Sequence, residues 1–221
     1  EVYKKPSLKY STWFSYKQLA DLHIKPGLGK RQLDRLQSSE LQAFYNYLSV
    51  SGRVDKGKQS KGKPAGLSSR TVRLCHIVIN GALKQAVKEG LIMWNPADAT
   101  DQPRQIKKEV KPLATDEVIY FLDAIKDHEI YPVIFADLGT GLRRGELLGL
   151  TWPDIDLTQK TATIRQSLLQ VGNEIYMQPD VKTKASRATI TLPDEVVKVL
   201  KQVKKDQAKN KMMLGEAYQN S

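Results

Sequence analysis

The 221-residue sequence has one cysteine, Cys75, and no long run of apolar residues. A single cysteine excludes an internal disulfide and any zinc site built from several cysteines, which favours a reducing, cytoplasmic compartment. A helix that spans a membrane needs about 18 consecutive apolar residues, and no stretch approaches that length. Residues 1–5 are largely charged and form no apolar signal segment. We therefore expect no association with a membrane.

The composition is that of a soluble protein with packed cores, with 40% hydrophobic and 27% charged residues, and the length favours two modest domains. The formal net charge of +11 is unevenly distributed. Residues 1–110 contain 20 Lys and Arg against nine Asp and Glu, whereas residues 111–221 contain 15 of each. A basic excess confined to one domain indicates a polyanionic partner, most often nucleic acid.

The densest basic stretch covers residues 53–73. Its Gly- and Lys-rich middle is also compatible with a solvated loop that binds nothing, but the charge continues onto a predicted helix. The candidate nucleic-acid-binding residues of the first half are Arg53, Lys56, Lys58, Lys61, Lys63, Arg70, Arg73 and Lys84.

The first half predicts helices alone. The clearest one begins after Ser68 or Ser69 and ends at Gly90, with Arg73 and Lys84 opposite its apolar stripe, where they can meet phosphates. Three helices are expected before it: one from Ser11 to Ile24, ended by Pro26-Gly27; a short one over residues 31–36; and one opened by a Ser39/Gln42 capping box and ended near Gly52.

Residues 96–112 contain three prolines and read as a linker. Beyond it, helices are expected over residues 115–127, 132–138 with Gly139 as the stop, 143–148 and from 193 onward, and strands over 161–168, 174–177 and 187–192. The predicted fold is an all-α domain over residues 1–95, the linker over 96–112, and an α+β domain over 113–221 with a small antiparallel sheet.

Two positions in the second half could carry chemistry. After two glycines and a threonine, Arg143 begins a short helix with Glu146 three residues later, a spacing that lets the carboxylate orient the guanidinium for a phosphate. From the residues alone, an ordinary surface pair on a packed helix is the simpler alternative. Further along, residues 180–187 form a polar turn that presents Lys182 and Lys184, although an ordinary solvated turn has the same composition.

The run TGLRRGELLGL at residues 140–150, followed by Trp152 and Asp154-Ile155-Asp156, resembles the first-arginine motif of the tyrosine recombinases, the phage integrase family. The resemblance implies that Arg143 contacts the scissile phosphate and that Glu146 supports the active site. Lys182 matches the family's catalytic lysine, and Lys184 is the fallback and a DNA-binding candidate. Residues 10–48 resemble, less closely, the family's helical, SAM-like core-binding domain.

This resemblance implies an integrase of a phage or another mobile element, which cuts and rejoins duplex DNA at attachment sites through a 3′-phosphotyrosine. Two arginines and a lysine supply the positive charge in such enzymes, so no metal and no cofactor are expected. Full-length members usually assemble as tetramers on DNA.

Part of the family's site is missing from the sequence. The second arginine belongs to a His-x-x-Arg pattern, but the residues three places after His23, His76 and His128 are Pro, Ile and Tyr. The last tyrosine, Tyr218, follows no such pattern and is rejected as the nucleophile. We expect the missing segment beyond Ser221, and we expect this fragment to bind DNA without cleaving it.

Two other functions stay open. A non-catalytic architectural protein would use the 69–89 helix in a groove of DNA and keep Arg143 for structure. An RNA-binding protein would prefer RNA to duplex DNA, but it leaves the second half without a role.

Overall fold

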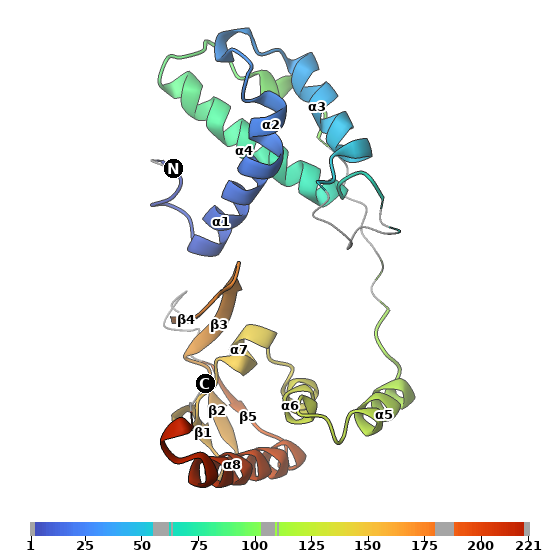
Figure 1. Cartoon of the computed structure of the whole chain (residues 1–221), viewed down its shortest axis with the longest axis vertical. Coiled ribbons are helices and arrows are strands. Elements are labelled where there is room, and N and C mark those ends of the chain that lie inside the picture. Colours follow the sequence, from blue (N-terminus) through green and yellow to red (C-terminus); the bar gives the residue numbers. More distant parts are fainter. Residues whose placement is uncertain are drawn as a thin grey trace. The chain divides into compact units, whose positions relative to one another are not determined.

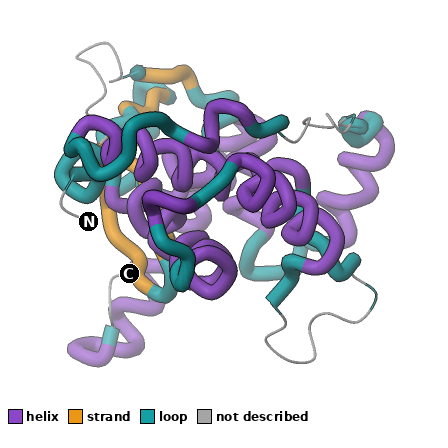
Figure 2. The backbone as a smooth tube through the Cα atoms, turned by 90° about the horizontal axis from the view of Figure 1, so that it is seen from above, coloured by secondary structure: helices purple, strands orange, loops and turns teal. Residues whose placement is uncertain are grey.

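The computed structural model describes residues 3–54, 62, 64–102, 109, 111–179 and 188–218. The chain divides into two compact units, residues 1–110 and 111–221 (Figure 1). Among the described residues, strands occur only between residues 155 and 191, and all other regular elements are helices (Figure 2). None of the described helices is both long and apolar enough to cross a membrane.

The first unit is helical, as predicted. Its early elements form one continuous helical run in which a π-helical turn precedes Pro26: α1 (Tyr10–Leu19), η1 (Ala20–Ile24) and α2 (Lys25–Leu28). The prediction that Pro26-Gly27 ends this helix is therefore wrong. Proline lacks an N–H and its ring crowds the preceding turn, and a widened π-helical turn lets the chain continue past it.

The first core lies between α3 (Ser38–Ser51) and α4 (Ser69–Lys88). Helix α4 begins as predicted, because the Ser68 hydroxyl accepts a hydrogen bond from the N–H of Thr71 at 3.2 Å. Helix α3 instead begins after Gln37, whose N–H donates to Glu40 at 3.1 Å, so the predicted Ser39/Gln42 capping box is wrong. The core side chains recur at helical spacing and include Leu41, Phe44, Tyr45, Leu48, Val72, Cys75, Ile79 and Leu83.

Two short 3-10 helices complete the first unit: η2 (Leu33–Arg35) and η4 (Pro96–Ala99). Ala97 is 1% exposed and belongs to the first core. The start of the expected linker, residues 96–99, thus packs against α3 and α4. Asn95 fixes this turn, because its side-chain oxygen accepts from the N–H of Ala97 at 3.0 Å.

The second unit is α+β, as predicted. Its helical elements are α5 (Thr115–Ala124), α6 (Tyr131–Thr140), α7 (Arg144–Leu148), η5 (Trp152–Asp154), α8 (Asp194–Leu214) and η7 (Gly215–Ala217). One antiparallel sheet has the order β1-β2-β5, formed by β1 (Ile155–Asp156), β2 (Thr161–Thr163) and β5 (Thr189–Thr191). A separate antiparallel hairpin pairs β3 (Gln166–Val171) with β4 (Glu174–Pro179). The segment predicted as one strand, residues 161–168, therefore contains β2 and the start of β3, which belong to different sheets.

The second core joins α6, β2 and α8 through Ala136, Ala162, Leu192, Val196 and Val197. Gly139, which the sequence suggested as a helix stop, lies inside α6. A Cβ at this position would lie 2.5 Å from Val196 Cγ2, so the glycine allows α8 to approach α6 closely. The stop is Gly141, which adopts the left-handed conformation (φ 63°) that caps many helices.

Candidate active site

Arg143 lies at the connection between α6 and α7. Gly141 turns the chain at the end of α6, and Arg143 follows two residues later as the N-cap of α7. A residue with a Cβ would be strained at a positive φ, so the glycine is what makes this tight connection possible. The Arg143 side chain is 87% exposed and thus accessible to a ligand.

The carboxylate of Glu146 orients Arg143 at two points. It accepts a hydrogen bond from Arg143 Nη1 at 2.8 Å and another from the Arg143 backbone N–H at 3.0 Å. Burial opposes ionisation of Glu146, but the guanidinium and backbone hydrogen bonds and the charge of Arg143 outweigh it and hold the Glu146 pKa below its ordinary value. A planar guanidinium held in this way can bind phosphate oxygens in a bidentate manner.

Two glycines seat α7 on the hairpin. A Cβ at Gly145 would lie 2.9 Å from the carbonyl oxygen of Leu168, and one at Gly149 would lie 2.8 Å from that of Gln166. The two glycines are one helical turn apart, so both face β3. The i,i+4 spacing of Gly145 and Gly149 is the feature of the sequence that indicates this close packing.

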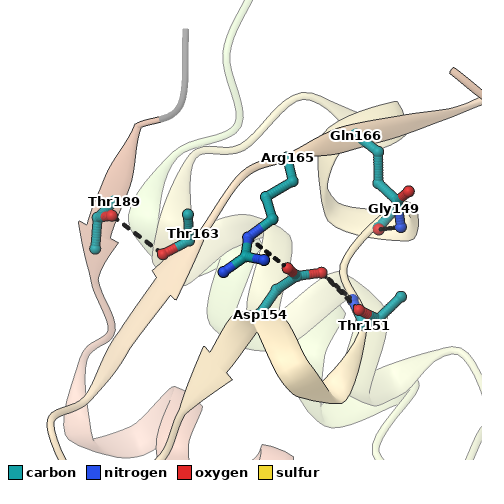
Figure 3. A network of polar contacts seen from close by, with 7 residues as sticks. All are labelled: Gly149, Thr151, Asp154, Thr163, Arg165, Gln166 and Thr189. Carbon is teal, nitrogen blue, oxygen red and sulfur yellow. Dashed lines mark hydrogen bonds and ion pairs between the residues drawn. The ribbon is translucent and has the colours of Figure 1, made fainter. Parts of the chain in front are cut away.

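A polar network secures the turn that follows α7 (Figure 3). The Gln166 side-chain amide donates to the Gly149 carbonyl at 3.1 Å. The buried Asp154 carboxylate accepts from the backbone N–H of Thr151 at 3.2 Å and its hydroxyl at 2.6 Å, and lies 3.1 Å from Arg165 Nε. The Thr-x-x-Asp spacing could have predicted the local cap, but nothing in the sequence points to Arg165 as the ionic partner.

The two predicted lysines of this unit, Lys182 and Lys184, lie outside the described residues. They belong to the segment that follows β4 and precedes β5. Strand β4 pairs with β3 along its whole length, and α7 packs against β3. In the sequence, this segment therefore follows the partner of the strand that α7 contacts. The assignment of Lys182 stays a prediction. Among the residues that the structure describes, no cluster of His, Cys, Asp or Glu could hold a metal ion.

In the first unit, three of the predicted basic residues lie on α4: Arg70 and Lys84 are exposed, and Arg73 is half-buried. Arg73 follows Arg70 by 3 residues and Lys84 follows Arg73 by 11, so all three lie on one side of the helix, away from the side whose residues are buried in the first core. Arg73 and Lys84 also line a groove between α4 and the α1 segment, together with Trp13 and Tyr16.

Arg53 also forms hydrogen bonds within the basic loop. Its Nε donates to the carbonyl of Pro64 at 2.6 Å, and its backbone N–H donates to Ala65 at 2.9 Å. These bonds join the two ends of the basic loop, so part of the guanidinium serves the structure of the loop. The other basic candidates of this loop, Lys56, Lys58, Lys61 and Lys63, lie outside the described part of the chain.

Two family descriptions match the chain: "Phage integrase, N-terminal SAM-like domain" matches residues 1–49, and "Phage integrase family" matches residues 111–214. The "Tyrosine recombinase XerC-like" protein of Caldanaerobacter subterraneus subsp. tengcongensis is 27% identical, over 97% of this chain and 55% of its own length. An "Integrase" of Streptomyces ambofaciens is also 27% identical, over 91% of this chain and 49% of its own length. The chain thus spans about half the length of these relatives.

Solved structures show the same fold. The Tn1549 transposon integrase in complex with a circular intermediate DNA matches with a TM-score of 0.73 at 23% identity, over 92% of this chain and 62% of that one. The lambda integrase tetramer bound to a Holliday junction matches with a TM-score of 0.63 at 18% identity, over 92% of this chain and 53% of that one. The two family matches, one in each unit, show that the chain belongs to the phage integrase family, the tyrosine recombinases.

Proposed function

We propose that this chain is the core-binding domain and the first part of the catalytic domain of an integrase, a site-specific recombinase of a phage or another mobile element. The observation that carries the proposal is the exposed Arg143 guanidinium, which Glu146 orients within the region that matches the integrase family. An exposed, oriented arginine is one of the groups that can stabilise the negative charge developing at a reacting phosphodiester.

In the proposed reaction, a tyrosine hydroxyl attacks the scissile phosphate, a 3′-phosphotyrosine forms, and the 5′-oxygen leaves. Arg143 stabilises the negative charge that develops on the phosphoryl oxygens, Glu146 keeps its guanidinium in place, and Lys182 donates a proton to the leaving oxygen. The second arginine and the tyrosine come from sequence that this chain does not contain. The chain alone therefore binds DNA without cutting it, and the chemistry proposed needs neither metal nor cofactor.

The first unit supplies most of the proposed affinity for duplex DNA. It carries the whole formal net charge of +11, and the position of Arg70, Arg73 and Lys84 on α4 supports a role in contacting phosphates. The proposed division is a DNA-clamping domain over residues 1–95, which the packed turn at residues 96–99 extends, a linker that ends at residue 112, and a catalytic part over residues 113–221. The full protein acts as a tetramer in the bacterial cytoplasm, an assembly supported by the lambda integrase tetramer on its Holliday junction.

Titration of duplex DNA at several salt concentrations tests this function. Binding through phosphates makes log K fall linearly with log salt, by roughly 0.9 for each phosphate contacted. We expect a steep slope that decreases when Arg73 and Lys84 are replaced by glutamine. A flat response, or a preference for RNA over duplex DNA, would contradict the proposal.

The reading frame supplies a second test. A His-x-x-Arg pattern followed by a tyrosine downstream of Ser221 supports the integrase. A stop codon at that point supports the architectural protein instead.

A further inference from the structure

Helix α7 depends on its neighbours for its position. It has five residues, and a helix of that length is not stable by itself. It contacts α6, and its Leu147 packs against the second core. It also contacts β3, through Gly145 and Gly149 on the strand backbone and through the hydrogen bond from Gln166 to the Gly149 carbonyl. The direction of Arg143, at the N-cap of α7, therefore depends in part on how α7 is attached to this strand.

The turn after α7 contains a carboxylate that is almost completely buried. Asp154 is 8% exposed, and burial of a carboxylate is unfavourable unless hydrogen bonds and an opposite charge compensate it. Here the Thr151 backbone N–H, the Thr151 hydroxyl and the Arg165 guanidinium all compensate it. Arg165 lies between β2 and β3, so the ion pair joins the turn after α7 to the start of β3 (Figure 3).

We propose that Asp154 and Arg165 are positioning residues for Arg143: their ion pair fixes the end of α7 to β3 and thereby sets the direction of the Arg143 guanidinium. The effect on the orientation of the guanidinium involves residues of the second unit alone. The consequence for binding of a DNA phosphate by Arg143 rests on the proposed function. Strand β3 pairs in register with β4, from Gln166↔Pro179 to Val171↔Glu174.

The first experiment observes Arg143 without DNA, by NMR of ¹⁵N-labelled arginine side chains in the whole chain. In Arg165→Gln, we expect the Arg143 Nε signal to move toward that of a solvated arginine, because α7 is no longer fixed and the contact with Glu146 weakens. Arg144→Gln is the matched control, since it removes the same charge from an exposed neighbour on α7. An Arg143 signal that stays unmoved in folded Arg165→Gln overturns the proposal.

Two further variants keep the test decisive if Arg165→Gln does not fold. Thr151→Val removes one hydrogen bond to Asp154 and retains the ion pair, so we expect a smaller movement of the Arg143 signal in the same direction. Arg165→Lys keeps a cation beside Asp154 and is expected to leave the Arg143 signal close to its position in the unsubstituted chain. An unmoved signal in Thr151→Val, or a signal in Arg165→Lys displaced further than in Thr151→Val, contradicts the positioning role.

The second experiment measures salt-dependent binding of duplex DNA. Removal of the Asp154 charge in Asp154→Asn would strengthen binding if bulk electrostatics alone mattered. The positioning role predicts the opposite: the slope of log K against log salt falls by about 0.9, as in Arg143→Ala, and the two changes together lower it no further. Tighter binding with an unchanged slope in Asp154→Asn overturns the proposal. An unchanged slope in Arg143→Ala would contradict the proposed contact between Arg143 and a DNA phosphate. The NMR result would still decide whether Asp154 and Arg165 position Arg143.

Discussion

The two units of the chain differ in how well they bury their own side chains. Among the described residues, the first core contains nine buried side chains around α3 and α4, and the second contains five that join α6, β2 and α8. Helix α5 of the second unit has no buried residue, and its Ile119 and Tyr120 are 64% and 77% exposed. The first unit therefore has the larger core, whereas the second presents its candidate catalytic arginine on a short, lightly packed element.

The largest change in the stability of either unit is expected from a substitution that creates a cavity in the first core. Leu41 is 0% exposed, and Leu41→Ala should lower the free energy of unfolding of the first unit by about 2–5 kcal/mol. Urea unfolding followed by circular dichroism measures this change. Val50→Ala, at a side chain that is 70% exposed, is the control and should change the free energy by less than about 0.5 kcal/mol. Equal effects of the two substitutions would refute the assigned core.

The second unit is most sensitive where α7 approaches β3. In Gly149→Ala, the new Cβ would lie 2.8 Å from the Gln166 carbonyl oxygen and 2.9 Å from Ser167 Cα, so backbone must move. We expect a loss of about 1–3 kcal/mol in the unfolding of the second unit, with the first unit unchanged. Leu148→Ala, at an exposed position of the same helix, serves as the control. A fully tolerated Gly149→Ala would show that α7 is not seated closely on β3.

A change of pH should act on the first unit through His23 and His76, since burial lowers the pKa of both; His76 is the more deeply buried. This ring is 2% exposed, and burial lowers its pKa below the ordinary 6.5; Asp98 opposes that shift, while Arg73 and Lys84 add to it. Because the folded pKa is depressed, the contribution of His76 to stability is complete above pH 6.5 and is lost as the pH falls toward the folded value. Unfolding measured between pH 8 and pH 5 should show this loss. His76→Gln should reduce it, and an unchanged pH dependence in that variant would assign the loss to another group.

The smallest effect is a gain in stability. Gly81 lies inside α4, and a Cβ there would meet only Lys4 Cε, at 3.9 Å. Gly81→Ala should stabilise the first unit by about 0.5–1 kcal/mol, because alanine loses less backbone entropy in a helix. Thermal unfolding measures the gain. A lower melting temperature would mean that this face of α4 has less space than the structure shows.

The sequence predicts well those features that neighbouring residues determine. The start of α4 follows from the cap at Ser68, and the apolar spacing after it fixes which face is buried. The pair of Arg143 and Glu146 likewise follows from a spacing of three residues at the start of a helix. In each case the interacting groups lie within one helical turn, so composition and spacing contain the information.

Features that depend on distant residues were missed. The neighbouring residues predict a helix stop at Gly139, because nothing close in the sequence shows that Val196 packs against it. Asp154 has a recognisable local cap, but its ionic partner, Arg165, comes from the connection between two sheets whose positions depend on tertiary packing. The site is therefore predictable at Arg143 itself and unpredictable in the contacts that hold α7 on the hairpin.

The most direct test of the central claim, that Arg143 acts on the scissile phosphate, compares two adjacent arginines in a protein that carries this chain together with the rest of the catalytic domain. The measurement is the rate at which a tyrosine becomes covalently joined to a cut DNA strand. We predict that Arg143→Ala lowers this rate by roughly 10²–10³-fold, as expected for the loss of one preorganised donor, and that Arg144→Ala changes it little. Equal rates in the two variants would contradict the account.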